Sequence, residues 1–222
     1  VNIKGGLVWF FGCEGGGTAN ITGGKVYQLS VNPTGDDETV VNISGGTSHG
    51  GRTDGTNYDS STWSVNGGTL NITGGTFGKV LFNYTGGNVD ISGGTFQSIS
   101  NSGASASAPV ASLLADECAF YGSEDGALKD GTETSLTDVT VKEHTHNVVN
   151  GACGCGLQFE AMITDAENNS KFYTRLADAA AAMKDNETLT LLADVDVSGI
   201  NGGLVFGHNN TTFDLGGHKL YS

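Results

Sequence analysis

Basic residues, prolines and long apolar runs are all scarce in this sequence. Only 10 Lys and Arg residues stand against 24 Asp and Glu residues, which gives a formal net charge of -14. Because such a surface repels phosphate backbones, we expect no nucleic-acid partner. The 36 glycines are accompanied by only 2 prolines and follow no Gly-X-Y period, so a collagen-like chain is excluded.

The sequence also lacks a membrane-spanning segment. No stretch reaches the roughly 18 consecutive apolar residues that a membrane helix needs, and no secretory signal opens the chain. We therefore expect no direct membrane insertion within these residues. Val1 and Ser222 both fall close to repetitive phrases, so we expect an excerpt of a longer protein whose signal or anchor lies elsewhere.

A short phrase recurs five times in the first half of the chain. Each copy has two apolar residues around Asn or Asp, then a polar residue and two glycines. The isoleucines of the copies are 18, 22, 29 and 19 residues apart, which is the length of one coil of short strands joined by turns. The copies begin at Val1, Ala19, Val41, Leu70 and Val89.

The repeat predicts an all-β fold, a right-handed parallel β-helix (solenoid). Apolar and polar side chains alternate in each copy, so one face points inward and the paired glycines turn the corner. Stacked coils would place the isoleucines in one interior ladder, and Phe77 and Phe96 in a second. The isoleucines of this predicted ladder are Ile3, Ile21, Ile43, Ile72 and Ile91.

The second half predicts a different organisation. From Ala104 the repeat gives way to Ala and Ser, which suggests an end cap, so residues 1–128 form the C-terminal part of a first β-helix with its cap. Residues 129–169 are expected to be a linker with a His/Cys hairpin, and a cut between Gly131 and Glu143 to leave a soluble first module.

Residues 170–222 are predicted to be a short helical cap and the first coils of a second β-helix. Ser170 is a plausible N-cap for a helix, and short apolar runs follow at 189–192, 204–206 and 213–215. Apolar residues recur at helical spacing at Phe172, Tyr173, Leu176, Ala179, Ala180 and Met183.

The His/Cys hairpin is a candidate metal site. Asn150-Gly151 is a preferred two-residue hairpin turn, and folding there pairs Val149 with Ala152. The strand period then brings four soft ligands to one face, and two imidazoles with two thiolates suit a closed, structural zinc site. These ligands are His144, His146, Cys153 and Cys155. Free thiols or a tight Cys153–Cys155 disulfide are the alternatives.

Other candidate sites are weaker. Cys13 and Cys118 are expected to be two separate buried thiols. Lyase chemistry needs a basic residue beside a carboxylate, and Arg52 and Arg175 are the only arginines. The acidic run Asp36, Asp37 and Glu38 could weakly bind calcium, but neighbouring turn residues do not converge across a sugar as a glycosidase requires. For contact with a partner, the long insertion offers Arg52, Asp54, Tyr58 and Trp63.

Several motifs together resemble a known class of proteins. These are Ile91-Ser92-Gly93-Gly94-Thr95-Phe96, Leu114-Ala115-Asp116, the His-Thr-His and Cys-Gly-Cys-Gly pair, and Asp214-Leu215-Gly216-Gly217-His218. They look like the large repetitive surface proteins of gut Firmicutes, which belong to the pectate-lyase-like right-handed β-helices. That class holds polysaccharide lyases, glycosidases and adhesins, so the resemblance implies the fold and an extracellular, cell-surface location more than an activity. Related proteins often place two residues between the cysteines, whereas this chain has Gly154 alone.

We therefore expect a non-catalytic surface module rather than an enzyme. It would present a rigid, acidic face to a host or secreted protein, such as an immunoglobulin, or to a glycan. A carbohydrate-active β-helix whose catalytic coils lie mostly outside these residues is the alternative from another class, and a structural stalk spacer is the third. Structural zinc is the only cofactor that the residues suggest, and the sequence predicts no oligomeric state.

Overall fold

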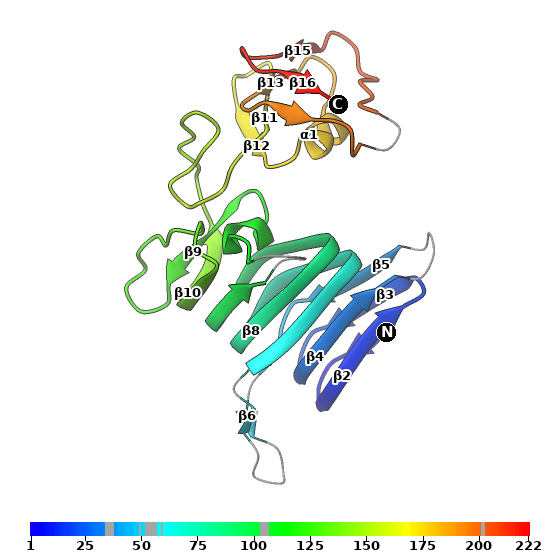
Figure 1. Cartoon of the computed structure of the whole chain (residues 1–222), viewed down its shortest axis with the longest axis vertical. Helices are drawn as coiled ribbons and strands as arrows, with labels where there is room; N and C mark the ends of the chain where they lie inside the picture. Colours follow the sequence, from blue (N-terminus) through cyan, green and yellow to red (C-terminus); the bar gives the residue numbers. More distant parts are fainter. Residues whose placement is uncertain (34–37, 49, 52–56, 59, 103–106, 201–202) are drawn as a thin grey trace. The chain divides into compact units, whose positions relative to one another are not determined.

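The computed structural model describes the whole chain except residues 34–37, 49, 52–56, 59, 103–106 and 201–202 (Figure 1). It divides into two compact units, Val1–Thr145 and His146–Ser222. Strands cover more residues than helices in both units, so the predicted all-β class is confirmed. None of the helices in the described ranges is long and apolar enough to cross a membrane.

The first unit is built mainly from strands that pair in parallel (Figure 1). Its long strand β8 covers more than one copy of the repeat. The strands are β1 (Asn2–Ile3), β2 (Leu7–Glu14), β3 (Gly17–Ile21), β4 (Lys25–Asn32), β5 (Thr39–Ile43), β6 (Gly50–Gly51), β7 (Asn57–Tyr58), β8 (Ser60–Asn101), β9 (Cys118–Gly122) and β10 (Ser135–Glu143). A short 3-10 helix, Val110–Leu113, lies between β8 and β9.

The repeated phrases lie side by side in register, as their alternation predicts. β1 pairs β3, β3 pairs β5 and β5 pairs β8, so that Ile3, Ile21, Ile43 and Ile72 follow one another. A second set of parallel pairs joins β2 to β4 and β4 to β8. The isoleucines from Ile21 onward are at most 2% exposed, and they form the core with Phe77 and Phe96, whose rings lie 5.0 Å apart.

A chain of asparagine side chains runs along the outside of the same strands. Asn20 donates to Asn2, Asn42 donates to Asn20 and Asn71 donates to Asn42, each from Nδ2 to Oδ1, at 3.1, 3.0 and 2.8 Å. Each amide therefore satisfies its neighbour in the next repeat. We call these four residues the asparagine ladder.

Antiparallel strands complete the first unit at the other end. β10 pairs antiparallel with β8 on one side and with β9 on the other. β10 lies inside residues 129–169, which the sequence analysis assigns to a linker. The difference arises because β10 is held by long-range pairing and carries no copy of the repeat phrase.

The second unit has a small core of its own around one helix, α1 (Leu176–Ala182). β11 lies between β12 and β13 with antiparallel pairing, and β13 pairs β15 in parallel, as does β14 with β16. The strands are β11 (Ala161–Thr164), β12 (Ser170–Tyr173), β13 (Thr188–Leu191), β14 (Val195–Asp196), β15 (Thr212–Asp214) and β16 (Leu220–Tyr221).

The prediction of a helix from Ser170 is wrong at its start. Residues 170–173 form β12, and the helix begins only at Leu176, whose N–H donates to the Glu160 carboxylate at 2.7 Å. A turn fixed by Asp165, which accepts N–H bonds from Glu167 and Asn169, directs β12 back onto β11. Pairing with β11 outweighs the local helical pattern of Phe172 and Tyr173.

Candidate metal centre

The hairpin predicted at Asn150-Gly151 is present. Both residues have positive φ, 50° and 76°, and Val149 and Ala152 exchange two backbone hydrogen bonds of 2.9 and 3.1 Å. A turn with positive φ at both central positions favours Asn followed by Gly, because these residues tolerate the left-handed region. The local sequence therefore fixes this turn.

Beyond that first pair the predicted hairpin ladder does not continue. The Cys153 N–H donates to the Leu157 carbonyl, and the Gly156 N–H donates to the Cys153 carbonyl, both at 3.0 Å. The segment from Cys153 to Leu157 is thus a tight turn rather than a strand, with Gly156 at a φ of 94°. This turn, not a strand period, carries the two cysteines.

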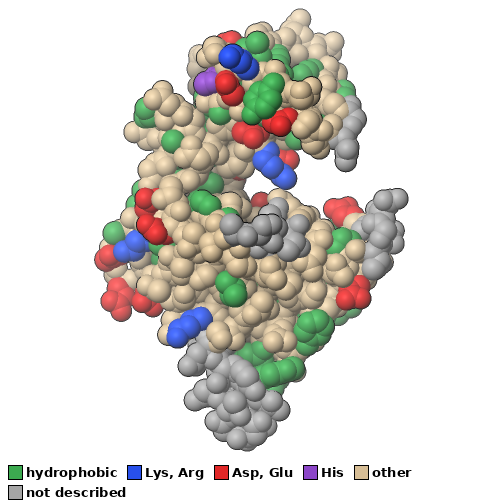
Figure 2. Space-filling view, in the orientation of Figure 1, with side chains coloured by type: hydrophobic (Ala, Val, Ile, Leu, Met, Phe, Trp, Pro, Cys, Tyr) green, Lys and Arg blue, Asp and Glu red, His purple; other side chains and the backbone are tan. Residues whose placement is uncertain are grey.

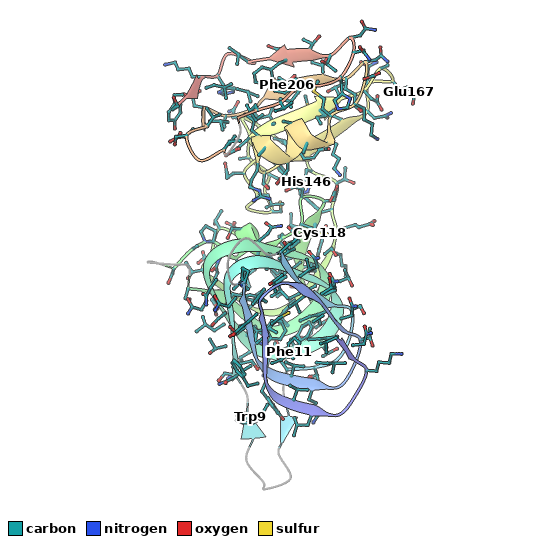
Figure 3. The ribbon with its side chains drawn as sticks, turned by 90° about the vertical axis from the view of Figure 1, so that its right-hand side faces the viewer. Trp9, Phe11, Cys118, His146, Glu167 and Phe206 are labelled. Carbon is teal, nitrogen blue, oxygen red and sulfur yellow. The ribbon has the colours of Figure 1, made fainter. Side chains whose placement is uncertain are left out.

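The structure brings the four predicted ligands together. The ligand atoms of His144, His146, Cys153 and Cys155 all lie within 4.8 Å of one another. Cys155 Sγ is 3.6 Å from Nδ1 of His146, which Figure 3 labels. We refer to these four residues as the His/Cys cluster, and they could hold a metal ion.

Burial sets the chemistry of the thiols. Cys155 is fully buried and Cys153 is 8% exposed, and no disulfide joins any of the four cysteines, so the alternative of a Cys153–Cys155 disulfide is not formed here. Burial raises the pKa of the Cys155 thiol to about 12, although a hydrogen bond from the Leu157 backbone acts in the opposite direction. Without a cation the buried thiol therefore keeps its proton, and a bound cation would have to displace it.

Two aromatic residues position the histidines. The Tyr121 hydroxyl, in β9, lies 2.8 Å from Nδ1 of His144, so Nε2 is the ring nitrogen that we assign to a metal. The ring of Phe159 packs against His146 with centroids 4.9 Å apart in an edge arrangement. The role of Tyr121 could not be predicted from the sequence, because β9 meets the segment that leads to His144 only through its pairing with β10.

The ligand set suits a closed site. Two imidazoles and two thiolates complete a tetrahedron, which leaves no position for a reacting water. Such a centre stabilises its surroundings and does not catalyse hydrolysis. The cluster therefore points to a structural role for a metal.

Of the four residues predicted to contact a partner, the structure describes only one with its side chain. Arg52 and Asp54 lie outside the described residues, and of Tyr58 only the backbone, in β7, is described. Trp63 is 1% exposed and packs edge-on against Phe77 and Phe82, so its prediction as a partner-binding residue is wrong. The reason is its register with Leu29 of β4, which places it at an interior position.

The other candidates show no second site. Arg175 pairs with Asp178 at 2.7 Å on the exposed side of α1, and Asp36 and Asp37 lie outside the described residues.

Cys118 is buried, and burial together with Glu117 and Glu143 raises its pKa to about 11. Cys13, in contrast, is only half-buried, so the prediction of a buried thiol is confirmed for Cys118 alone.

Comparison of the chain with protein-family models, with curated proteins and with solved structures finds no match among any of them. The function must therefore be argued from the residues themselves.

Proposed function

We propose that the first unit is a right-handed parallel β-helix and that the chain acts as a non-catalytic module on the outside of a bacterium. In this proposal the coils form a rigid scaffold that presents a polar, acidic surface to a host or secreted protein, or to a glycan. The observation that carries the proposal is the in-register pairing of four successive repeats with the asparagine ladder beside it. Stacked coils of this kind provide extended binding surfaces.

The surface offers a regular row for such contacts. One residue beyond each core isoleucine, an exposed polar side chain occupies the same place in successive repeats. Acidic side chains outnumber basic ones in the chain, and Figure 2 shows few Lys and Arg side chains over the first unit. The row consists of Thr22, Ser44, Thr73 and Ser92.

The binding test uses the full chain as bait for host secretions and for a panel of gut glycans. The proposal expects a saturable partner that stays bound at high salt, and Thr73→Arg should weaken that binding at least tenfold. Gln28→Arg, an exposed change in β4, is the matched control and should leave binding unchanged. A polysaccharide that is enriched and shortened would instead establish the carbohydrate-active alternative. If neither a protein nor a glycan binds, the result would favour the structural stalk spacer.

For the His/Cys cluster we propose that the metal is zinc. The His₂Cys₂ set and the burial of its two thiols match structural zinc sites, in which four such ligands fill the tetrahedral coordination of the ion. The role of the ion would be to fix the tight turn from Cys153 to Leu157, which few backbone hydrogen bonds hold otherwise.

Calorimetric titration of metal-free protein with Zn²⁺ tests this second part. We expect one ion per chain, and Co²⁺ should give the intense visible absorption of a tetrahedral thiolate site. Cys153→Ser and Cys155→Ser should each abolish tight binding, whereas Cys13→Ser, a half-buried thiol in β2, should not. Equal binding by the Cys155→Ser protein would refute the site.

A further inference from the structure

The two edges of the first unit's sheet differ. At one edge β9 and β10 close the sheet with antiparallel pairs, whereas β1 and β2 are the last strands at the other edge. Figure 3 looks toward this edge, which we call the β1–β2 edge, and labels Trp9 and Phe11 there. Figure 2 shows hydrophobic side chains gathered over β2 at the lower right.

Interior positions are uncovered at this edge. Val8, Phe11 and Cys13 are half-buried, yet their register partners one repeat later, Val26, Leu29 and Val31, are only 4%, 1% and 0% exposed. The same holds for Ile3, which is half-buried, against 2% for Ile21. Since each later repeat is covered by the one before it, these side chains occupy core positions that lack a cover.

The glycine at position 5 indicates what kind of segment would cover this edge. A Cβ atom added at Gly23, Gly45, Gly74 or Gly93 would lie 2.6, 2.6, 2.9 or 2.3 Å from a backbone oxygen of the preceding repeat. At Gly5, the equivalent residue of the first repeat, nothing lies within 4 Å, and its φ is outside the left-handed region. Nothing in the described structure therefore requires glycine at position 5, whereas a neighbouring coil would.

The asparagine ladder has an open end at the same edge. Asn2 accepts a hydrogen bond from Asn20, and within the described residues its own amide nitrogen donates to no further asparagine. In the later repeats that nitrogen donates to the asparagine of the repeat before. The Nδ2 group of Asn2 could thus donate to the side-chain oxygen of an asparagine in a preceding repeat.

We propose that the β1–β2 edge binds one further coil of the same repeat, which runs parallel to β1 and β2 and bears its own asparagine and glycine pair. A single coil cannot bury its apolar face alone, so a coil attached in the chain is favoured over a free peptide. The proposal rests on the stacked coils and is independent of the zinc site and of any host partner.

The test adds a coil to the full chain. One extended protein carries a copy of residues 70–88 in front of Val1, so that the junction repeats the natural Asn88-Val89 step with a 19-residue spacing of isoleucines. A second carries a copy of residues 1–18, with an 18-residue spacing. Thermal unfolding and acrylamide quenching of Trp9, which is 39% exposed while Trp63 is buried, are measured on each and on the parent chain.

The extended proteins should unfold at a higher temperature and protect Trp9 from quencher. Gly5→Ala should leave the melting temperature of the parent chain within about 1 °C but lower that of the extended proteins by about 5 °C, because the new side chain meets a backbone carbonyl only there. Gly23→Ala is the matched control and should lower it in all three proteins.

Three results would overturn the proposal. The first is an equal effect of Gly5→Ala in parent and extended proteins, and the second is that neither extension folds or protects Trp9. The third is self-association of the parent chain, measured by sedimentation, that Gly5→Ala weakens, since the edge would then bind a second copy. A failure of zinc or partner binding would leave all of these results unaffected.

Discussion

At the scale of single residues, the asparagine ladder is the feature most dependent on exact side-chain chemistry. Asn42 sits in its middle, where it donates to Asn20 and accepts from Asn71. We expect Asn42→Leu to lower the free energy of unfolding by about 1–3 kcal/mol, because two half-buried amide groups lose their partner. Chemical denaturation measures this. Asn2→Leu removes only one bond at the ladder end, so an equal loss in both variants would contradict the account.

Tyr121 contacts the His/Cys cluster through His144. We expect Tyr121→Phe to weaken zinc binding about 10-fold, since the hydroxyl that orients the imidazole is lost while the ring remains. Calorimetric titration gives the affinity, and the unfolding temperature of the metal-free protein should change little. Tyr221→Phe, at an exposed site, is the control. Unchanged zinc affinity in the Tyr121→Phe protein would remove Tyr121 from the site.

Residue-scale predictions from sequence succeed where the signal is local. The hairpin at Asn150-Gly151 follows from two adjacent residues, and the four residues of the His/Cys cluster lie within 12 positions of one another. Trp63 and Tyr121 were not predictable in this way. The position of Trp63 depends on its register with β4, and that of Tyr121 on the pairing of β9 with β10. Neither pairing can be inferred from the neighbouring sequence.

At the scale of elements, α1 is the part of the second unit whose packing can be tested most directly. Leu176 is fully buried in the core cluster with Leu189 and Leu191. We expect Leu176→Ala to cost about 2–5 kcal/mol of stability, from lost burial and the cavity left behind. Circular dichroism during denaturation checks this, with Lys184→Ala as the exposed control. A loss no larger than that of the control would show that the helix does not hold this core.

The turn between β11 and β12 makes stability depend on pH. Hydrogen bonds from the Asn169 side chain and backbone, and from Glu167, lower the pKa of Asp165 below its ordinary value of 3.8. A lowered carboxyl pKa contributes stability above the unfolded-state value and loses it as the pH falls through the folded-state pKa. Asp165→Asn should therefore lower stability at neutral pH and flatten its fall below about pH 4. An acid titration that superimposes on that of the unmodified chain would argue against this.

Element boundaries were the weakest sequence-based predictions, and the reason is physical. Phe172 and Tyr173 fit a helical period, but β12 gains a full antiparallel pairing with β11. The parallel repeats could be predicted because each copy carries the same alternation and glycine pair, so local pattern and long-range register agree.

At the scale of the whole molecule, the structure moves the boundary of the first unit. The repeat pattern in the sequence predicts a soluble module from a cut between Gly131 and Glu143. The structure instead ends the first unit at Thr145, because β10 pairs with both β8 and β9. Any cut inside β10 would leave two strand edges unpaired, and such edges promote aggregation.

Two truncated proteins decide between these boundaries. We expect a chain ending at Thr145 to be soluble and to unfold cooperatively, whereas one ending at Thr134, just before β10, should aggregate. Size-exclusion chromatography and thermal unfolding measure both. Limited proteolysis of the full chain should leave 135–143 intact, since its backbone is paired on two sides. A soluble, cooperative 1–134 protein would restore the earlier boundary and make β10 an accessory strand, whereas its aggregation would show that the stack of repeats needs β10 to close its end.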